Sequence, residues 1–335
     1  QMIVDKGVTL TRPLIMRLSF YCVLEVCIED PDEPKDPETP HFIPAYSQKV
    51  KASKEFQTFQ FDHSFVLNSL KSSMEGYVFH NQPLDTDDLL EQTVKLFNSC
   101  KTSLELFDML HNMRAYDDST YAHSLNVALI CRRIGKWLKV DAATLDTLTL
   151  CGLLHDIGKL KIPDEILNKP DKYTDEEFDL VKRHTKFGYE LLKTLNIDPH
   201  IKKAALLHHE RCDGSGYPLK ATQKDLDDFS MVVAIADVYD AMTAARSYRA
   251  PLCPFQVIER FEQEGLQKYK PKFILTFLQH IASTYQNNRV LLSNGQSANI
   301  VMLNQQHLAR PIVQLNDNSC IDLSTRLDLH IQSIL

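Results

Sequence analysis

The chain has 335 residues, of which 44% are hydrophobic and 24% are charged, and its formal net charge is −7. This length favours a main domain with one or two small attachments, and the hydrophobic fraction is typical of a globular protein with a large core. The acidic balance argues against broad binding to duplex nucleic acid, which needs a basic surface. No apolar run approaches the roughly 18 residues that can cross a bilayer, so we expect no membrane span.

The eight cysteines predict a reducing compartment. They form no CxxC pair, and several lie in apolar periodic segments where a free thiol packs as a small hydrophobe; they are Cys22, Cys27, Cys100, Cys131, Cys151, Cys212, Cys253 and Cys320. The first residues show no basic segment followed by an apolar one, as a secretory signal would. We therefore expect a cytoplasmic protein.

The first part of the chain predicts a small N-terminal α/β unit, which we place at residues 1–84 as an accessory or regulatory element. Residues 7–10 and 20–28 are rich in β-branched and aromatic types and predict short strands. Residues 31–40 contain four prolines among mostly acidic neighbours, which indicates an exposed loop. The pattern over residues 41–61 is compatible with either a helix or a strand.

From residue 85 onward the spacing of apolar residues becomes helical. Residues 85–113 predict one long or two broken connecting helices, opened by the acidic run at 85–88. Further helices are expected over residues 119–138, 141–154, 174–195, 199–209, 226–243 and 254–269. We assign residues 114–287 to the main domain. Residues 288–335 alternate apolar and polar types around turns and predict a small C-terminal β appendage.

Metal-ligand residue types are concentrated between residues 153 and 218. His155 and Asp156 directly follow the apolar run 148–154, so they are expected at the C-terminal end of a buried helix. Adjacent helical side chains diverge by about 100°, which lets the histidine bind one metal while the carboxylate bridges two. Lys159 lies one turn after His155 on the same predicted face, where its ammonium can meet a metal-bound phosphate. An isolated His-Asp pair is usually structural, so the neighbouring signals decide its interpretation.

A second helix end repeats this pattern. His208 and His209 close the apolar run 204–207 and are followed by Glu210 and the glycine-rich turn 213–218, whose glycines allow a tight loop and close approach to a ligand. His184 falls within the predicted helical stretch 179–192. A single histidine in such a helix is most often a partly buried side chain with a protein partner.

Two further residues complete a ligand set. Asp237 lies within an apolar run, where a charged carboxylate is costly unless it is paired or bound to a metal, and His123 comes from the separate helix 119–138. Together the candidates offer seven nitrogen or oxygen ligands and no thiolate: His123, His155, Asp156, His184, His208, His209 and Asp237. Seven ligands exceed a tetrahedral zinc site and suit two octahedral iron or manganese ions that share a bridging carboxylate and water.

The two motifs together resemble one family. Residues 155–159 read HDIGK and residues 208–218 read HHERCDGSGYP, and this pair resembles the HD-GYP family of HD-domain phosphohydrolases over roughly residues 110–285. The resemblance implies an HD-domain helical bundle that acts as a metal-dependent phosphodiesterase on cyclic di-GMP. It also implies that the seven ligands hold a di-iron or di-manganese centre, with Asp156 and Lys159 as catalytic residues and Lys159 in contact with substrate phosphate.

The resemblance extends to residues around the centre. Arg246 and Arg249 match a family segment and are implied to hold the phosphates or guanine of the substrate, although the alternative is a solvated helix end. Tyr217 belongs to the GYP loop, which is implied to shape the substrate site and to engage signalling partners. Some members bind a third metal through a glutamate four residues before the first histidine, where this chain has Ser119. We therefore expect a binuclear centre.

The expected reaction is attack of a metal-bridging hydroxide on phosphorus, which gives pGpG and, if that product rebinds, GMP. One alternative is a phosphodiesterase for another cyclic dinucleotide such as cyclic GMP-AMP. Another is a receptor that binds cyclic di-GMP without turnover, and a scaffold function of the GYP loop is compatible with either. A homodimer through residues 86–113 is also a hypothesis.

Overall fold

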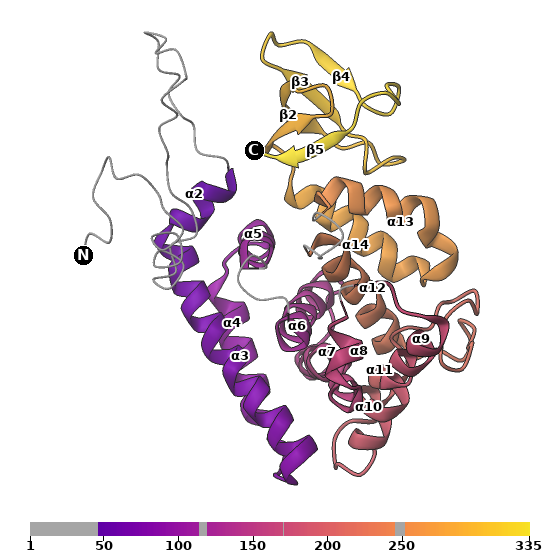
Figure 1. The fold of residues 1–335 in the computed structure, drawn as a ribbon. Coiled ribbons are helices and arrows are strands. Elements are labelled where there is room, and N and C mark those ends of the chain that lie inside the picture. The colour runs from indigo at the N-terminus through magenta and orange to yellow at the C-terminus, as the bar shows by residue number, and fades with distance from the viewer. Residues whose placement is uncertain (1–45, 114–118, 170, 245–251) are drawn as a thin grey trace, which may run out of the picture. The chain divides into compact units, whose positions relative to one another are not determined.

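The computed structural model describes residues 46–113, 119–169, 171–244 and 252–335, which are mostly helical (Figure 1). Their elements belong to Pro44–Leu335, one of the two units into which the chain divides. The strands predicted at 7–10 and 20–28 and the loop predicted at 31–40 lie outside the described residues. No helix of the described part is long and apolar enough to span a membrane.

The first helices are α2 (Tyr46–Ala52), α3 (Lys54–His80), α4 (Thr86–Ser99), α5 (Ser103–Met113), α6 (Thr120–Trp137), α7 (Ala142–Leu154) and the 3₁₀-helix η1 (Ile157–Lys161). They are followed by α8 (Asp164–Leu167), α9 (Asp175–Lys182), α10 (His184–Leu192), α11 (Pro199–Leu207), α12 (Asp228–Thr243), α13 (Pro254–Lys268) and α14 (Pro271–Thr284). The strands are β1 (Arg289–Leu292), β2 (Ser297–Met302), β3 (Ile312–Leu315), β4 (Cys320–Asp322) and β5 (Ile331–Ile334).

The predicted fold class, mainly helical with a C-terminal β appendage, is confirmed. Ser119, Asp141 and Asp227 cap α6, α7 and α12 by accepting hydrogen bonds from backbone N–H groups, as polar N-cap residues do. The helix predicted over residues 174–195 was wrong in one respect, because it is interrupted at Arg183 and forms α9 and α10.

No helix was expected over α14 or over most of α3, and the start of α3 lies in residues 41–61, whose pattern fits either a helix or a strand. In α3 the buried face carries residues at helical spacing, yet Phe61 and Phe65 are 73% and 62% exposed. These outward aromatic side chains obscure the 3.6-residue period that identifies an amphipathic helix. The helix α3 nevertheless packs against α4, α5 and α6.

The core of the bundle is built around α6, α7 and α12. Residues 231–237 of α12 are all buried, so the middle of this helix is surrounded by protein. The backbones of α6 and α7 approach closely where Gly152 faces Ala128, since a Cβ at position 152 would lie 2.7 Å from the Ala128 Cα. This close contact holds the C-terminal end of α7 against the first half of α6.

The C-terminal strands form an antiparallel sheet in the order β4-β3-β2-β1-β5. One face buries Val290, Ile300 and Val313. The segment that leads into β3 is tied to α13 by an ion pair of 2.8 Å between Arg310 and Glu259. The sheet is therefore attached to the helical bundle by polar as well as apolar contacts.

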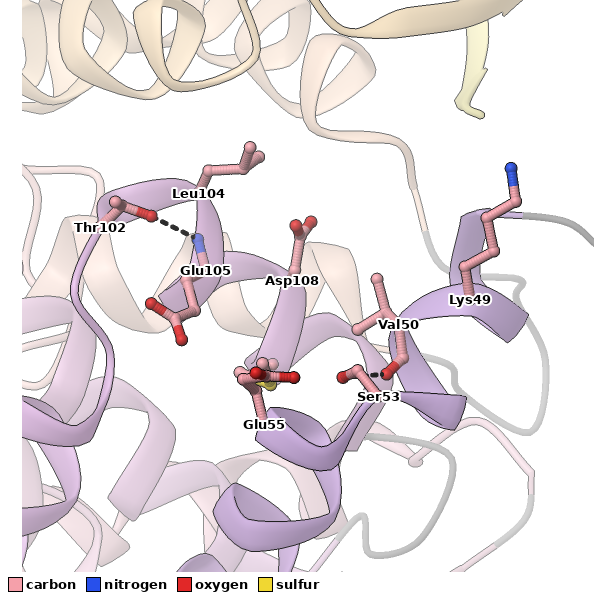
Figure 2. A pocket seen from close by; sticks show the side chains of 9 residues that line it. Lys49, Val50, Ser53, Glu55, Thr102, Leu104, Glu105 and Asp108 are labelled. Atoms are coloured by element: carbon pink, nitrogen blue, oxygen red, sulfur yellow. Dashed lines mark hydrogen bonds between the residues drawn. The ribbon is translucent and has the colours of Figure 1, made fainter.

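A cavity of about 370 Å³ opens between α2, α3 and α5 (Figure 2). Its wall includes Lys49 and Glu55 and the first turns of α5, where the Glu105 N–H donates to the Thr102 hydroxyl over 3.1 Å. The cavity contains none of the seven predicted metal ligands. Its lining contains no histidine or cysteine, so it lacks the imidazole ligands of the predicted metal centre.

The contact between α6 and α7 predicts the effect of a single methyl group. Gly152→Ala must push two helix backbones apart, and we expect it to lower the free energy of unfolding by about 1–3 kcal/mol. Gly265→Ala in α13 is the matched control, because its Cβ would meet nothing closer than 3.6 Å; it should be neutral or stabilise by up to about 1 kcal/mol. Urea unfolding of the two variants tests this, and equal stabilities would contradict the described packing.

Candidate metal centre

The structure brings all seven predicted ligands together, from five helices or helix ends. His155 and Asp156 follow the last residue of α7, and His208 and His209 follow the last residue of α11, as predicted. His184 does not lie inside a helix as expected but is the first residue of α10, immediately after the break at Arg183. His123 lies in the first turn of α6 and Asp237 lies in α12.

The ligand atoms form two groups that can each hold a metal ion. The first contains Asp156, His184, His208 and His209, and the second contains His123, His155 and Asp237; within each group the ligand atoms lie within 4.8 Å of one another. All these residues except His123 and His209 are buried. Among the described residues, no other set of histidine, cysteine or carboxylate side chains is grouped this closely.

Asp156 lies between the two groups and faces each with one oxygen. Its Oδ1 is 3.3 Å from His184 Nε2 and 3.6 Å from His208 Nε2. Its Oδ2 is 3.3 Å from His155 Nε2 and 3.6 Å from His123 Nε2. A single carboxylate can therefore serve both groups, which is the arrangement expected of a ligand that bridges two ions.

Three of the histidines are oriented by backbone carbonyls. Nδ1 of His155 lies 2.7 Å from the Gly152 oxygen, and Nδ1 of His184 lies 2.7 Å from the Val181 oxygen. Nδ1 of His208 lies 3.0 Å from the Ala204 oxygen. Because a carbonyl can only accept, each Nδ1 carries the proton and each Nε2 keeps its lone pair for a metal.

These carbonyls belong to the last turns of α7, α9 and α11; the Ala204 oxygen also accepts the His208 N–H, and the Val181 oxygen also accepts the Arg183 N–H. The three C-terminal ends therefore direct carbonyl oxygens and the negative ends of their helix dipoles toward the same centre. This field favours a cation there. The helix ends and the negative charge of the carboxylates both favour binding of a cation at this centre.

The chemistry of the donor atoms also fits a metal. His155 Nε2 and both carboxylate oxygens of Asp156 are buried and, within the described part of the chain, form no hydrogen bond of acceptable geometry. Asp156 Oδ2 has the Lys159 ammonium at 2.6 Å, but burying His155 Nε2 and Asp156 Oδ1 without a hydrogen bond costs roughly 1–3 kcal/mol each, and more for a charged group. A divalent cation bound by these atoms would remove that cost. The residues present thus suit the metal centre that the sequence predicted.

The pKa values of the carboxylates favour their ionised forms. Burial alone would raise the pKa of Asp156, but the positive charge of Lys159 and interactions with His155 outweigh it and hold the pKa well below 3.8. Burial likewise opposes ionisation of Asp237, yet its hydrogen bond to His123 leads the interactions that keep its pKa well below 3.8. Both carboxylates are therefore anionic near neutral pH.

The histidines of the first group are neutral. Burial lowers the pKa of His184 to about 3 and also lowers the pKa of His208. It lowers the pKa of His209 well below 6.5. A metal binds the unprotonated form of imidazole, so these groups need not lose a proton before they bind one.

His123 is held differently from the other ligands. Its Nε2 lies 3.0 Å from Asp237 Oδ1, and its Nδ1 lies 2.8 Å from Asp240 Oδ2. Burial would lower its pKa, but hydrogen bonds to these two carboxylates raise it to about 9. The sequence analysis assigned no role to Asp240. The available signal was its position three residues after Asp237, which places both carboxylates on one face of a helix.

Lys159 reaches the centre by a route other than the one predicted. The chain leaves α7 at His155 and forms the 3₁₀-helix η1, so Lys159 does not continue the face of the α-helix. Its Nζ nevertheless lies 2.6 Å from Asp156 Oδ2. The lysine therefore places a positive charge beside the central carboxylate.

A glycine sets the distance between η1 and α10. A Cβ at Gly158 would lie 1.9 Å from the His184 oxygen and 2.4 Å from the Gly188 nitrogen. Both atoms are backbone, so neither can move cheaply. This contact explains the glycine in the HDIGK motif, because the motif must pack directly on the helix that begins with His184.

The glycine-rich loop folds back onto the second helix end. Glu210 is buried and accepts hydrogen bonds from the backbone N–H groups of Leu219 and Ala221, over 2.5 Å and 3.0 Å. A Cβ at Gly216 would lie 2.4 Å from the Glu210 Cα, and the Tyr217 ring stacks on His209 with centroids 4.7 Å apart. Glu210 thus braces the loop, and Tyr217 stacks on a candidate ligand.

The remaining predicted substrate contacts lie outside the described residues. Arg246 and Arg249 fall in residues 245–251. Their assignment stays a prediction from the family resemblance.

Comparison with known proteins identifies the family. A family model described as the HD domain matches residues 88–273, which is more than half of the chain. The chain therefore belongs to the HD-domain family, as the motifs predicted. The matched region contains every residue of the two candidate metal groups.

Relatives of known activity fall into two kinds. The chain is 34% identical over 183 residues to a 3'3'-cGAMP-specific phosphodiesterase of Vibrio cholerae, an alignment that covers 54% of this chain and 35% of that protein. It is 32% identical over 207 residues to a cyclic di-GMP phosphodiesterase of Pseudomonas aeruginosa, covering 62% and 50%. It is 35% identical over 178 residues to a cyclic di-GMP phosphodiesterase of Thermotoga maritima, covering 52% and 48%. The chain thus spans half or less of the length of these relatives.

The packing of η1 on α10 predicts a loss of metal binding without any change to a ligand. Gly158→Ala should displace His184 from Asp156 and weaken Mn²⁺ binding by about tenfold or more. Loss of a group that orients a metal ligand has an effect of this size. Gly188→Ala is the matched control, because its Cβ would approach no atom closer than 3.4 Å. Titration calorimetry measures both affinities. An unchanged affinity in Gly158→Ala would contradict the described contact.

Proposed function

We propose that this protein is a metal-dependent phosphodiesterase that hydrolyses cyclic di-GMP. The observation that carries the proposal is the position of Asp156, whose two oxygens face two separate groups of imidazole and carboxylate ligands. Such a centre suits two divalent cations, and we propose iron or manganese because the donors are nitrogen and oxygen and include no thiolate.

Two cations bound there would supply Lewis-acid charge to a phosphodiester and make water more acidic. The chain itself contributes orientation and charge. The backbone carbonyls at the three helix ends fix the direction of His155, His184 and His208. Lys159 is 22% exposed at its side chain, so its ammonium can contact both Asp156 and a phosphate oxygen and offset the negative charge that develops during hydrolysis.

The substrate assignment draws on the motifs and on the relatives. The HDIGK and GYP segments and two of the three relatives above point to cyclic di-GMP. Hydrolysis of one phosphodiester bond by water opens the ring and yields pGpG, and a second cleavage yields GMP. The relative named for 3'3'-cGAMP is as similar in sequence, so a mixed cyclic dinucleotide is the second candidate substrate.

Compartment, assembly and partners are further parts of the proposal. We propose a cytoplasmic location, which is supported by the free state of all six cysteines in the described residues. A homodimer through α4 and α5 would use their outward polar faces, because Leu89, Leu96, Phe107 and Leu110 are buried within the protomer. The GYP loop remains our proposed contact for a signalling partner.

Anaerobic incubation with Fe²⁺ or Mn²⁺ and an excess of cyclic di-GMP is expected to produce pGpG or GMP. The reason is that both metal groups and Lys159 are in place in the folded chain. Chromatography of the products measures the reaction. The double variant His155→Ala/Asp156→Ala removes a ligand from each group and should give no product.

A parallel incubation with an equimolar mixture of cyclic di-GMP and 3'3'-cGAMP decides the substrate. Faster loss of cyclic di-GMP supports the proposal, and selective loss of 3'3'-cGAMP would replace it with the second candidate. Tight binding of cyclic di-GMP without turnover in either metal form would contradict the enzyme and favour the receptor.

A lysine pair tests the charge beside the centre. Lys159→Met should lower kcat by about 10²-fold or more, because it removes a charge placed to stabilise the transition state. Lys161→Met is the control, since Lys161 is exposed and its Nζ contacts the Val78 oxygen at 3.3 Å instead of the centre. Steady-state kinetics of the metal-loaded variants measures kcat. If both lysine variants kept the wild-type kcat, the proposed role of Lys159 would be wrong.

A further inference from the structure

The metal-ligand histidines differ in what holds their Nδ1 atoms. His155, His184 and His208 follow helix C-terminal ends and use the nearby carbonyls of those ends. His123 lies at the opposite end of its helix, in the first turn of α6, where the Ser119 oxygen already accepts the backbone N–H of His123 over 3.0 Å. Its Nδ1 is contacted instead by a carboxylate from a different helix, Asp240 of α12.

The position of Asp240 follows from the geometry of α12. Asp237 and Asp240 are three residues apart, so their side chains lie on the same face of the helix. His123 is held between them, with Nε2 at 3.0 Å from Asp237 and Nδ1 at 2.8 Å from Asp240. Asp240 is 3% exposed. One helix thus supplies both a candidate ligand of the second group and the residue that orients a neighbouring ligand.

We propose that Asp240 is a positioning residue for the second metal group, formed by His123, His155 and Asp237. By accepting the Nδ1 proton of His123 it fixes the tautomer and ring direction that present Nε2 to a metal. Its negative charge also makes that imidazole a stronger donor. This inference rests on the metal centre of the proposed function. It adds that one of the two metal groups depends on Asp240 and the other does not.

The role is specific to one of the two groups. His123 is not among the candidate ligands of the first group, which are Asp156, His184, His208 and His209. Loss of Asp240 is therefore expected to weaken one metal site and leave the other intact. A general structural defect would instead weaken both sites and lower the melting temperature of the metal-free protein.

Mn²⁺ titration of the full chain, followed by calorimetry and by the amount of bound metal, tests the inference. The wild type should bind two Mn²⁺ ions per chain. Asp240→Ala should weaken one of these sites by about 100-fold, and Asp240→Asn, which keeps an acceptor oxygen but loses the charge, by about tenfold. The melting temperature of each metal-free variant reports whether it folds. If Asp240→Ala does not fold, Asp240→Asn decides the test.

A second histidine–carboxylate pair in the same fold provides the control. His200 Nδ1 lies 2.7 Å from Asp227 Oδ2 at the starts of α11 and α12, and neither residue belongs to a metal group. Asp227→Asn makes the same chemical change and preserves the N-cap of α12, since asparagine caps as well as aspartate. It should bind both ions with wild-type affinity.

The possible results distinguish the role of Asp240 from the existence of the metal centre. Two Mn²⁺ sites of unchanged affinity in both Asp240 variants would overturn the role of Asp240 and leave the metal centre standing. A wild-type chain that binds no Mn²⁺ and no Fe²⁺ would overturn both. Selective weakening of one site in the Asp240 variants, with Asp227→Asn unaffected, would support the positioning role.

Discussion

The constraint on which the centre depends is the burial of an ionised carboxylate. Asp156 is 1% exposed, and its oxygens lack well-formed hydrogen bonds within the described residues. Taking such a group out of water is costly unless positive charge surrounds it. Within the described residues Lys159 supplies positive charge, with its Nζ 2.6 Å from Asp156 Oδ2, whereas the imidazoles of His184 and His208 are neutral and the helix ends behind them present carbonyl oxygens. A buried, ionised Asp156 is stable at this position only if cations can bind in the space between these groups. This requirement links the packing of the bundle to its proposed chemistry.

Close backbone contacts translate this requirement into structure. Gly152 lets α7 approach α6, Gly158 lets η1 approach α10, and Gly216 lets the glycine-rich loop return to the turn that carries His209. The first two contacts join segments that carry or directly follow different ligands, and the third places the loop on the turn that follows His208 and His209. Because the atoms facing these glycines are backbone, the spacing of the ligands is set by the packing of main chains. Substitutions at these glycines can therefore alter metal binding while every ligand is retained.

The sequence predicted the parts of the site that are encoded locally. A histidine and a carboxylate after an apolar run indicate a helix end, and α7 and α11 end where that pattern placed them. The break before His184 was missed, because residues on both sides of Arg183 have helical spacing and only tertiary packing separates α9 from α10. The helix α3 was missed for a related reason, since exposed Phe61 and Phe65 do not follow its amphipathic period. Predicted contacts at Arg246 and Arg249 stay predictions.

The role of Asp240 could not be predicted from the sequence alone. Its type and spacing are visible three residues after Asp237, but nothing local says which side chain it orients, because His123 is 117 positions away in the chain. Whether a histidine needs such a carboxylate depends on whether it lies at the start or after the end of a helix. His155, His184 and His208 each come directly after a helix end and find carbonyl partners within four residues, even though His184 also begins α10. His123 lies in a first turn, and its Nδ1 is contacted by a carboxylate of α12 instead.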